Sequence, residues 1–131
     1  ALNTGHDGSL STGHANSPKD MISRLETMVL MGMDLPLPAI ERQIASGLDI
    51  IVHLGRLRDK SRKVLEVTEV LGYWDGQIHL QTIYRYEEIH KEDENVTENE
   101  KKDQENKVHG EWKKVAELFH REKLVAAGYY I

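Results

Sequence analysis

The first third of the chain carries apolar residues at helical spacing. In residues 17–33 they recur every three or four positions, as Met21, Ile22, Leu25, Met28 and Val29. This spacing predicts a helix with one face in a core, and we expect the methionines at 21, 28, 31 and 33 to pack there. An adaptable surface for a partner is the alternative for these methionines. A second helix is predicted from Pro38 to about residue 47, because proline suits the first helical turn and apolar residues again share one face.

After residue 49 the period changes from helical to two. Ile50-Ile51-Val52-His53-Leu54 is almost uninterrupted and predicts a strand covered on both faces of a mostly parallel sheet. A β-rich run over 64–71 and an Asp75-Gly76 turn predict a hairpin. Its return strand, residues 77–86, alternates cleanly. The side chains expected on one face of this strand are Ile78, Leu80, Thr82, Tyr84 and Tyr86.

The last third opens with an acidic run. Residues 87–106 hold nine acidic residues against three lysines, and such a stretch buries too little apolar surface to offset its ordering entropy. A loop is therefore expected there, followed by a strand over 107–112 and a helix over 115–127. The chain divides accordingly into residues 1–86, the acidic loop 87–106 and a C-terminal strand and helix over 107–131.

The composition excludes several classes of protein. With 131 residues the chain forms one domain or a large piece of one. The net charge of −5 is concentrated in the acidic run, so no long cationic stripe offers a nucleic-acid surface. No apolar run approaches the roughly 20 residues of a membrane helix. The absence of cysteine excludes disulfides and favours a reducing, cytoplasmic compartment. A motif rich in histidine, glycine and hydroxyl residues begins at Thr4, directly after the start of the sequence. We therefore expect that the chain is truncated.

The candidate chemistry lies in residues 4–18, Thr-Gly-His-Asp-Gly-Ser-Leu-Ser-Thr-Gly-His-Ala-Asn-Ser-Pro. The pattern predicts a glycine turn, a short strand over 9–12, a loop and a helix that begins at Ser17-Pro18. In open α/β sheets such a loop binds ligands, and the helix N-terminus favours anions. His14 lies in this loop and can donate a hydrogen bond to a phosphate oxygen. An ordinary structural connection is the alternative.

Other chemistries find less support in the sequence. His6, Asp7 and His14 could ligate zinc, but their spacing matches no zinc signature, and no metal site is predicted. Serine nucleophiles lack the G-x-S-x-G elbow. The phosphate-binding loop G-x-x-x-x-G-K-[ST] is also absent from the 131 residues. This chain alone is therefore not expected to hydrolyse ATP.

Residues 4–18 resemble the histidine box of the bacterial secretion NTPases, the hexameric motor ATPases of type II and type IV secretion, conjugation and pilus assembly. The sequence of these residues is most similar to the branch of the family that assembles tight-adherence (Flp) pili. Residues 17–33 and 56–59 also resemble that branch. The resemblance implies an α/β fold, the C-terminal portion of a RecA-like P-loop NTPase domain. Such a domain has mostly parallel strands with flanking helices, here joined by an antiparallel β-hairpin and a C-terminal helix.

The same resemblance implies roles for single residues. His14 would sense the γ-phosphate with His6 as its companion, and Thr12 would position phosphate or water. ATP and magnesium would bind in the full-length parent, with none expected on this chain. The glycines expected to let the loop approach the nucleotide are Gly5, Gly8 and Gly13. The arginines expected at a subunit interface are Arg56, Arg58 and Arg62.

The partners implied are other copies in a hexamer and inner-membrane platform proteins, at the cytoplasmic face of the membrane. The chain by itself is expected to form a non-native dimer or to exchange strands, because uncovered sheet edges associate. A different class of function stays open beside the ATPase. In that alternative the chain is a self-associating interaction module without nucleotide chemistry.

Overall fold

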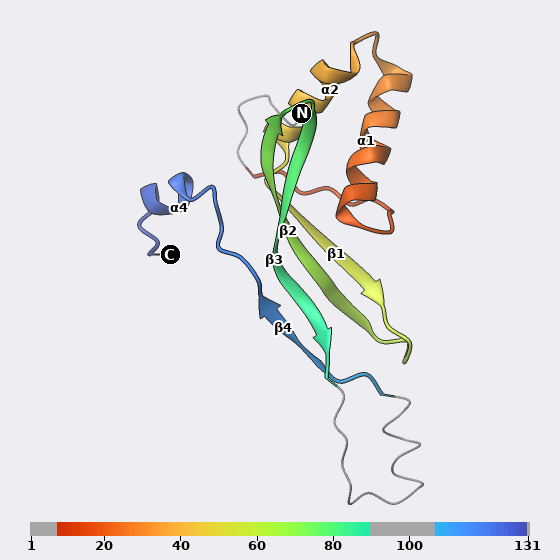
Figure 1. Cartoon of the computed structure of the whole chain (residues 1–131), viewed down its shortest axis with the longest axis vertical. Coiled ribbons are helices and arrows are strands. Elements are labelled where there is room, and N and C mark those ends of the chain that lie inside the picture. Colours follow the sequence, from red (N-terminus) through yellow and green to blue (C-terminus); the bar gives the residue numbers. More distant parts are fainter. Residues whose placement is uncertain (1–7, 90–106, 131) are drawn as a thin grey trace, which may run out of the picture.

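The computed structural model describes residues 8–89 and 107–130, which form a four-stranded antiparallel sheet and three helices. The elements follow in the order α1 (Pro18–Gly32), α2 (Leu37–Gly47), β1 (Ile50–Arg56), β2 (Arg62–Trp74), β3 (Gln77–Glu88), β4 (Gly110–Lys114) and α4 (Glu122–Ala126). Neighbouring strands follow the chain, in the order β1-β2-β3-β4. The long β2–β3 ribbon forms the axis of the molecule, with α1 and α2 on one side and α4 on the other (Figure 1).

The two N-terminal helices build the core. Ile22 of α1 packs with Ile40 and Ile44 of α2, and all three are buried. Partly buried side chains of the sheet complete this cluster, among them Ile51 and Leu80. The 3.6-residue spacing of apolar residues in the sequence therefore places the apolar face of each helix against the sheet.

Three irregularities interrupt the sheet, and one of them lies at Leu71 of β2, because Val70 pairs with Leu80 while Gly72 pairs with His79. Opposite β1, Leu65 of β2 is an extra residue, because His53 pairs with Glu66 while Leu54 pairs with Val64. Opposite β2, Ile83 of β3 is extra, because Thr68 pairs with Thr82 while Val67 pairs with Tyr84. Each bulge changes which side chains share a face.

The β2–β3 turn confirms the hairpin prediction. Asp75 has φ of 52° and Gly76 has φ of 74°, and positive φ at both central residues is the mark of a type I′ turn. The two predicted N-terminal helices are also confirmed, within one residue of the expected limits.

The sheet corrects the prediction of mostly parallel strands. All three strand pairs are antiparallel, because tight turns join β1 to β2 and β2 to β3. β1 is an edge strand whose residues alternate between exposed and half-buried, whereas coverage on both faces was expected. The run 9–12 forms no strand, since no described strand lies beside it as a partner.

Three further expectations are wrong in detail. The Ile83 bulge moves Tyr84 and Tyr86 to the face opposite Thr82, so the five alternating residues do not share one face. The apolar pattern over 115–127 yields only the short helix α4, because residues 115–120 are irregular and are held by hydrogen bonds to the sheet. The last strand begins at Gly110 instead of residue 107.

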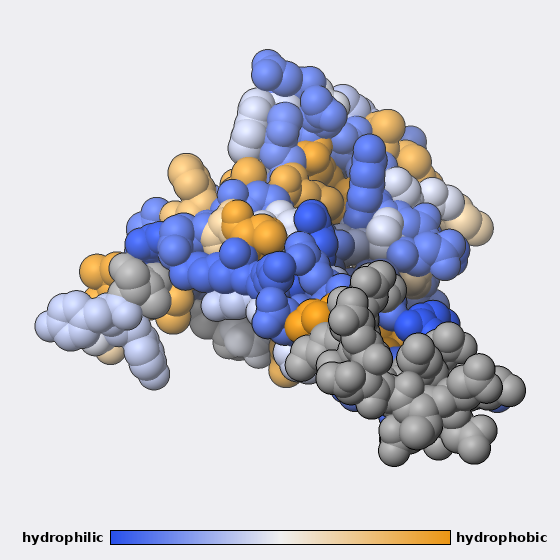
Figure 2. Space-filling model, turned by 60° about the horizontal axis from the view of Figure 1, so that its bottom comes forward, coloured by the Kyte–Doolittle hydropathy of each residue, from blue (hydrophilic) through white to orange (hydrophobic). Residues whose placement is uncertain are grey.

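The expected loop over 87–106 falls largely outside the described residues, and Glu87 and Glu88 belong to β3. Met28, Met31 and Met33 are exposed and do not join the core. Figure 2 shows hydrophobic areas as separate patches within a largely hydrophilic surface on one face of the molecule.

Candidate functional site

The start of α1 is fixed by reciprocal side-chain caps. The Ser17 hydroxyl accepts a hydrogen bond from the Asp20 amide at 3.0 Å, and the Asp20 carboxylate accepts from the Asn16 amide at 3.0 Å. The first bond satisfies an amide that a helix N-terminus leaves without a partner, and the second holds the residue before the cap. The Asn16 amide and then the Arg24 guanidinium lower the pKa of Asp20. The sequence signal of Ser17-Pro18 therefore predicted the helix start correctly.

His14 and Thr12 lie just ahead of this cap, and both are exposed. Gly13 packs against α1, because a Cβ there would lie 2.8 Å from the sulfur of Met21. Gly8 has φ of 87°, which favours glycine. His6 and Gly5 lie outside the described residues. The loop thus holds an exposed imidazole next to a capped helix N-terminus.

An open pocket of about 250 Å³ lies between the start of α1 and the sheet. Glu66 lines it, and its Oε1 accepts hydrogen bonds from Thr68 at 2.8 Å and Thr82 at 2.5 Å. Lys19 supplies a cation on the helix side. His14 does not line this pocket.

Metal binding finds no support in the described part of the chain, where no group of three or more histidine, aspartate and glutamate side chains could hold an ion. The zinc alternative drawn from His6, Asp7 and His14 rests partly on residues outside that part. It therefore gains nothing from the structure.

The arginines predicted at an interface lie at the β1–β2 turn. Arg56 and Arg62 are directly opposite each other in the ladder, and both are exposed. Arg58 forms an ion pair with Glu88 of β3. The turn therefore carries its cations on a surface that is open in the described part of the chain.

Asp59 fastens this turn. Its Oδ1 accepts from the Ser61 hydroxyl at 2.5 Å and the Ser61 amide at 2.9 Å, and its Oδ2 accepts from the Val108 amide at 2.9 Å. The Ser61 hydroxyl, and after it the Val108 amide, lower the pKa of Asp59 to about 2. One carboxylate thus ties the turn to the chain that approaches β4.

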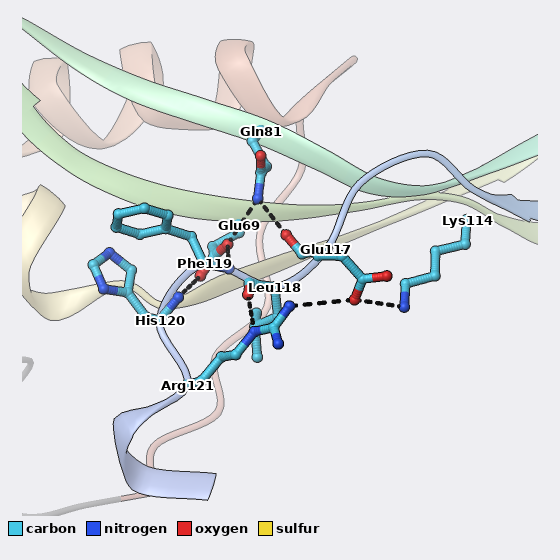
Figure 3. A network of polar contacts seen from close by, with 8 residues as sticks. All are labelled: Glu69, Gln81, Lys114, Glu117, Leu118, Phe119, His120 and Arg121. Atoms are coloured by element: carbon cyan, nitrogen blue, oxygen red, sulfur yellow. Dashed lines mark hydrogen bonds and ion pairs between the residues drawn. The ribbon is translucent and has the colours of Figure 1, made fainter. Parts of the chain in front are cut away.

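The sequence did not predict a polar network that lies on the face of the sheet opposite α1 and α2. Glu69 of β2 is only 1% exposed, and its two oxygens accept from the Phe119 amide at 2.8 Å and the His120 amide at 2.9 Å (Figure 3). Gln81 of β3 donates to Glu69 at 3.1 Å and to the Glu117 carbonyl at 2.7 Å. This network fastens the C-terminal segment to the sheet.

Further contacts extend the network along the segment. Lys114 and Arg121 both reach the Glu117 carboxylate, at 2.7 Å and 3.4 Å, and Lys114 is the main cause that lowers the pKa of Glu117. The ring Nε2 of His120 lies 2.7 Å from the Leu71 carbonyl and donates to it. A charged residue inside the β-rich run Val67-Thr68-Glu69-Val70 was the only sequence signal of this site.

The predicted residues therefore fall into two groups on different elements. His14, Thr12, Gly8 and Gly13 precede α1, while the arginines surround the β1–β2 turn. No described hydrogen bond or ion pair joins one group to the other.

Comparison with known proteins adds the family. The family described as "Type II/IV secretion system protein" matches residues 1–123 of this chain. The chain belongs to the type II/IV secretion system protein family.

Two relatives of the secretion system chain come from Mycobacterium tuberculosis, strains CDC 1551 and H37Rv, and both are named as conjugal transfer proteins. Each is 33% identical over 84 residues, which cover 64% of this chain and 23% of the relative. The matched region thus spans about a quarter of the length of these relatives. None of the described helices is long and apolar enough to cross a membrane.

Proposed function

We propose that this chain is the C-terminal part of a RecA-like motor ATPase, which works as a hexamer and powers secretion, conjugation or pilus assembly. Family membership over residues 1–123 is the observation that carries the proposal. The names of the mycobacterial relatives support a transfer system, and the form of residues 4–18 favours the tight-adherence pilus branch. In this proposal the protein works at the cytoplasmic face of the membrane with platform proteins.

The proposed contribution of this chain is a nucleotide sensor. His14 is exposed, and the cap that follows fixes the direction of α1. A hydrogen bond from the imidazole to the γ-phosphate would couple the nucleotide state to the position of α1. His6 and Thr12 assist in this proposal, and Gly5, Gly8 and Gly13 let the loop approach the nucleotide.

The exposed histidine fits one part of an ATP site, and magnesium would bind together with ATP in the full-length protein. An exposed imidazole suits a phosphate oxygen, but the chain holds no phosphate-binding loop with its lysine. The main phosphate contacts would come from another part of the longer protein. Arg56, Arg58 and Arg62 are proposed to face a neighbouring subunit, since guanidinium groups pair well with carboxylate and phosphate.

The test is ATP hydrolysis by the full-length protein whose coding sequence contains this chain. His14→Ala is expected to abolish turnover, while His109→Ala, which also removes an exposed imidazole, keeps it. Unchanged hydrolysis in His14→Ala would contradict the sensor role. A reading frame that encodes only these 131 residues would contradict the ATPase assignment as a whole.

The second candidate is a self-associating module without nucleotide chemistry. The observation that favours it is that β1, within the part of the chain that the structure describes, is an edge strand with exposed apolar side chains. Hydrolysis by the full-length protein would exclude this candidate as the sole function.

A further inference from the structure

The loop that carries His14 is fastened to the first turn of α1 on the C-terminal side of the histidine. The Asp20 carboxylate accepts a hydrogen bond from the Asn16 amide at 3.0 Å. Asn16 lies two residues after His14 and outside the helix, so its amide is not one of those that the first turn of the helix leaves without a partner. The bond therefore holds the backbone of the loop against α1.

A second contact lies on the other side of the histidine. Gly13 directly precedes His14, and a Cβ on this glycine would lie 2.8 Å from the sulfur of Met21. Met21 follows Asp20 in the first turn of α1. The Ser17 hydroxyl accepts from the Asp20 amide and the Ser17 carbonyl accepts from the Met21 amide, each at 3.0 Å. Two successive residues of one rigid turn thus hold the loop on both sides of His14.

The Asp20 carboxylate is also contacted from within the helix. Arg24, one turn later, donates from Nε to the same carboxylate oxygen at 3.1 Å. The Arg24 side chain is 53% exposed, and exposed ion pairs of this kind contribute little. The Asn16 amide comes before Arg24 among the causes that lower the pKa of Asp20. The contact with the loop amide therefore outweighs the ion pair.

We propose that Asp20 is a positioning residue for His14, an inference that rests on the proposed role of His14 as a γ-phosphate sensor. A side chain that is held in its productive orientation loses no further freedom when it meets its ligand. Asp20 acts through the backbone of the loop and needs no contact with the nucleotide. Because the same turn also holds Gly13, a displacement of His14 carries the start of α1 with it.

A helix cap without any effect on turnover is the alternative role for Asp20. Loss of a simple cap lowers stability and leaves the kinetics of the folded protein unchanged. Loss of a positioning contact lowers kcat, and it leaves KM for ATP nearly unchanged if the main phosphate contacts come from another part of the longer protein. Kinetic measurements therefore distinguish the two roles.

The first test measures ATP hydrolysis by the full-length protein whose coding sequence contains this chain. Asp20→Ala is expected to lower kcat about tenfold or more and to change KM less than about threefold. Asp20→Asn keeps an oxygen that can accept from the Asn16 amide, and Arg24→Gln removes only the ion pair. Both are expected to keep kcat within about threefold of the wild type. Wild-type kcat in Asp20→Ala, or an Asp20→Asn protein as slow as Asp20→Ala, would overturn the proposal.

The second test measures hydrogen exchange of the same full-length proteins without nucleotide. In Asp20→Ala the peptide that contains Asn16 is expected to exchange about threefold faster or more, while the peptides of α2 keep their wild-type rates. Unchanged exchange around Asn16 would overturn the proposal. If Asp20→Ala exchanges faster throughout the chain, Asp20→Ser replaces it in both tests, because its shorter side chain does not reach the Asn16 amide.

The two tests separate this proposal from the proposed function. A full-length protein that does not hydrolyse ATP, or that keeps its turnover in His14→Ala, contradicts the sensor and with it the positioning role. Turnover that depends on His14 but not on Asp20 contradicts the positioning role alone.

Discussion

The two faces of the sheet are covered by different kinds of contact. On one face α1 and α2 bring Ile22, Ile40 and Ile44 against apolar side chains of the strands. On the other face the C-terminal segment is held mainly by hydrogen bonds to the buried carboxylate of Glu69. Apolar burial tolerates small shifts in position, whereas a carboxylate that binds two successive amides fixes the segment at one place. The comparison predicts different responses to mutation on the two faces.

The largest effect is expected from Ile40→Ala on the helix face. Ile40 is completely buried, and such a truncation costs about 2–5 kcal/mol of unfolding free energy. Urea denaturation measures this loss. The matched control is Leu37→Ala on the same helix, where the side chain is exposed and the change stays within about 0.5 kcal/mol. Equal losses in both variants would mean that the helix face does not form the core.

A smaller and local effect is expected from Glu69→Ala on the other face. The change leaves the Phe119 and His120 amides without an acceptor, at a cost of about 1–3 kcal/mol. Hydrogen exchange should show faster exchange of these two amides while the amides of α2 stay protected. Glu69→Gln keeps one acceptor oxygen and should give an intermediate rate. Uniformly faster exchange across the whole chain would contradict a local role.

The cap of α1 is expected to contribute less than either face. Ser17→Ala removes the acceptor for the Asp20 amide, and loss of such a cap costs about 1 kcal/mol. Thermal and urea unfolding measure the loss. Ser23→Ala, in the exposed part of the same helix, is the control and should be nearly neutral. A similar loss in both variants would contradict the capping role.

The smallest effect concerns the Asp59 turn at low pH. The pKa of Asp59 is lowered to about 2 from its usual 3.8, so the folded state favours the charged carboxylate. Its contribution to stability is complete above about pH 4 and is lost as the pH falls toward 2. Exchange of the Val108 amide should accelerate over this range, and Asp59→Asn should remove this dependence. A variant with the same pH profile as the wild type would contradict the tie.

The sequence predicted the helix face well because each signal there is local. The spacing of Ile40 and Ile44, the Ser17-Pro18 cap and the Asp75-Gly76 turn depend on neighbours within a few residues. The bulge at Ile83 depends on the register between two strands, which no local pattern encodes. The expectation for Tyr84 and Tyr86 was wrong for that reason.

The other face was not predictable in the same way. Glu69 and the amides that it binds lie 50 and 51 residues apart, and the apolar pattern over 115–127 favoured a helix instead. Tertiary hydrogen bonds outweigh helix propensity there, since short helices are marginal without packing. The histidine loop was recognised by resemblance, and its chemistry stays a prediction.

Gly55 gives the β1–β2 hairpin a single permitted alignment. A Cβ at this position would overlap the side chain of Leu65, the extra residue of the bulge. If β1 slid by one residue along β2, Leu54 or Arg56 would replace the glycine against Leu65 and collide with it. The absence of a side chain in glycine at position 55 therefore fixes the alignment of β1 with β2.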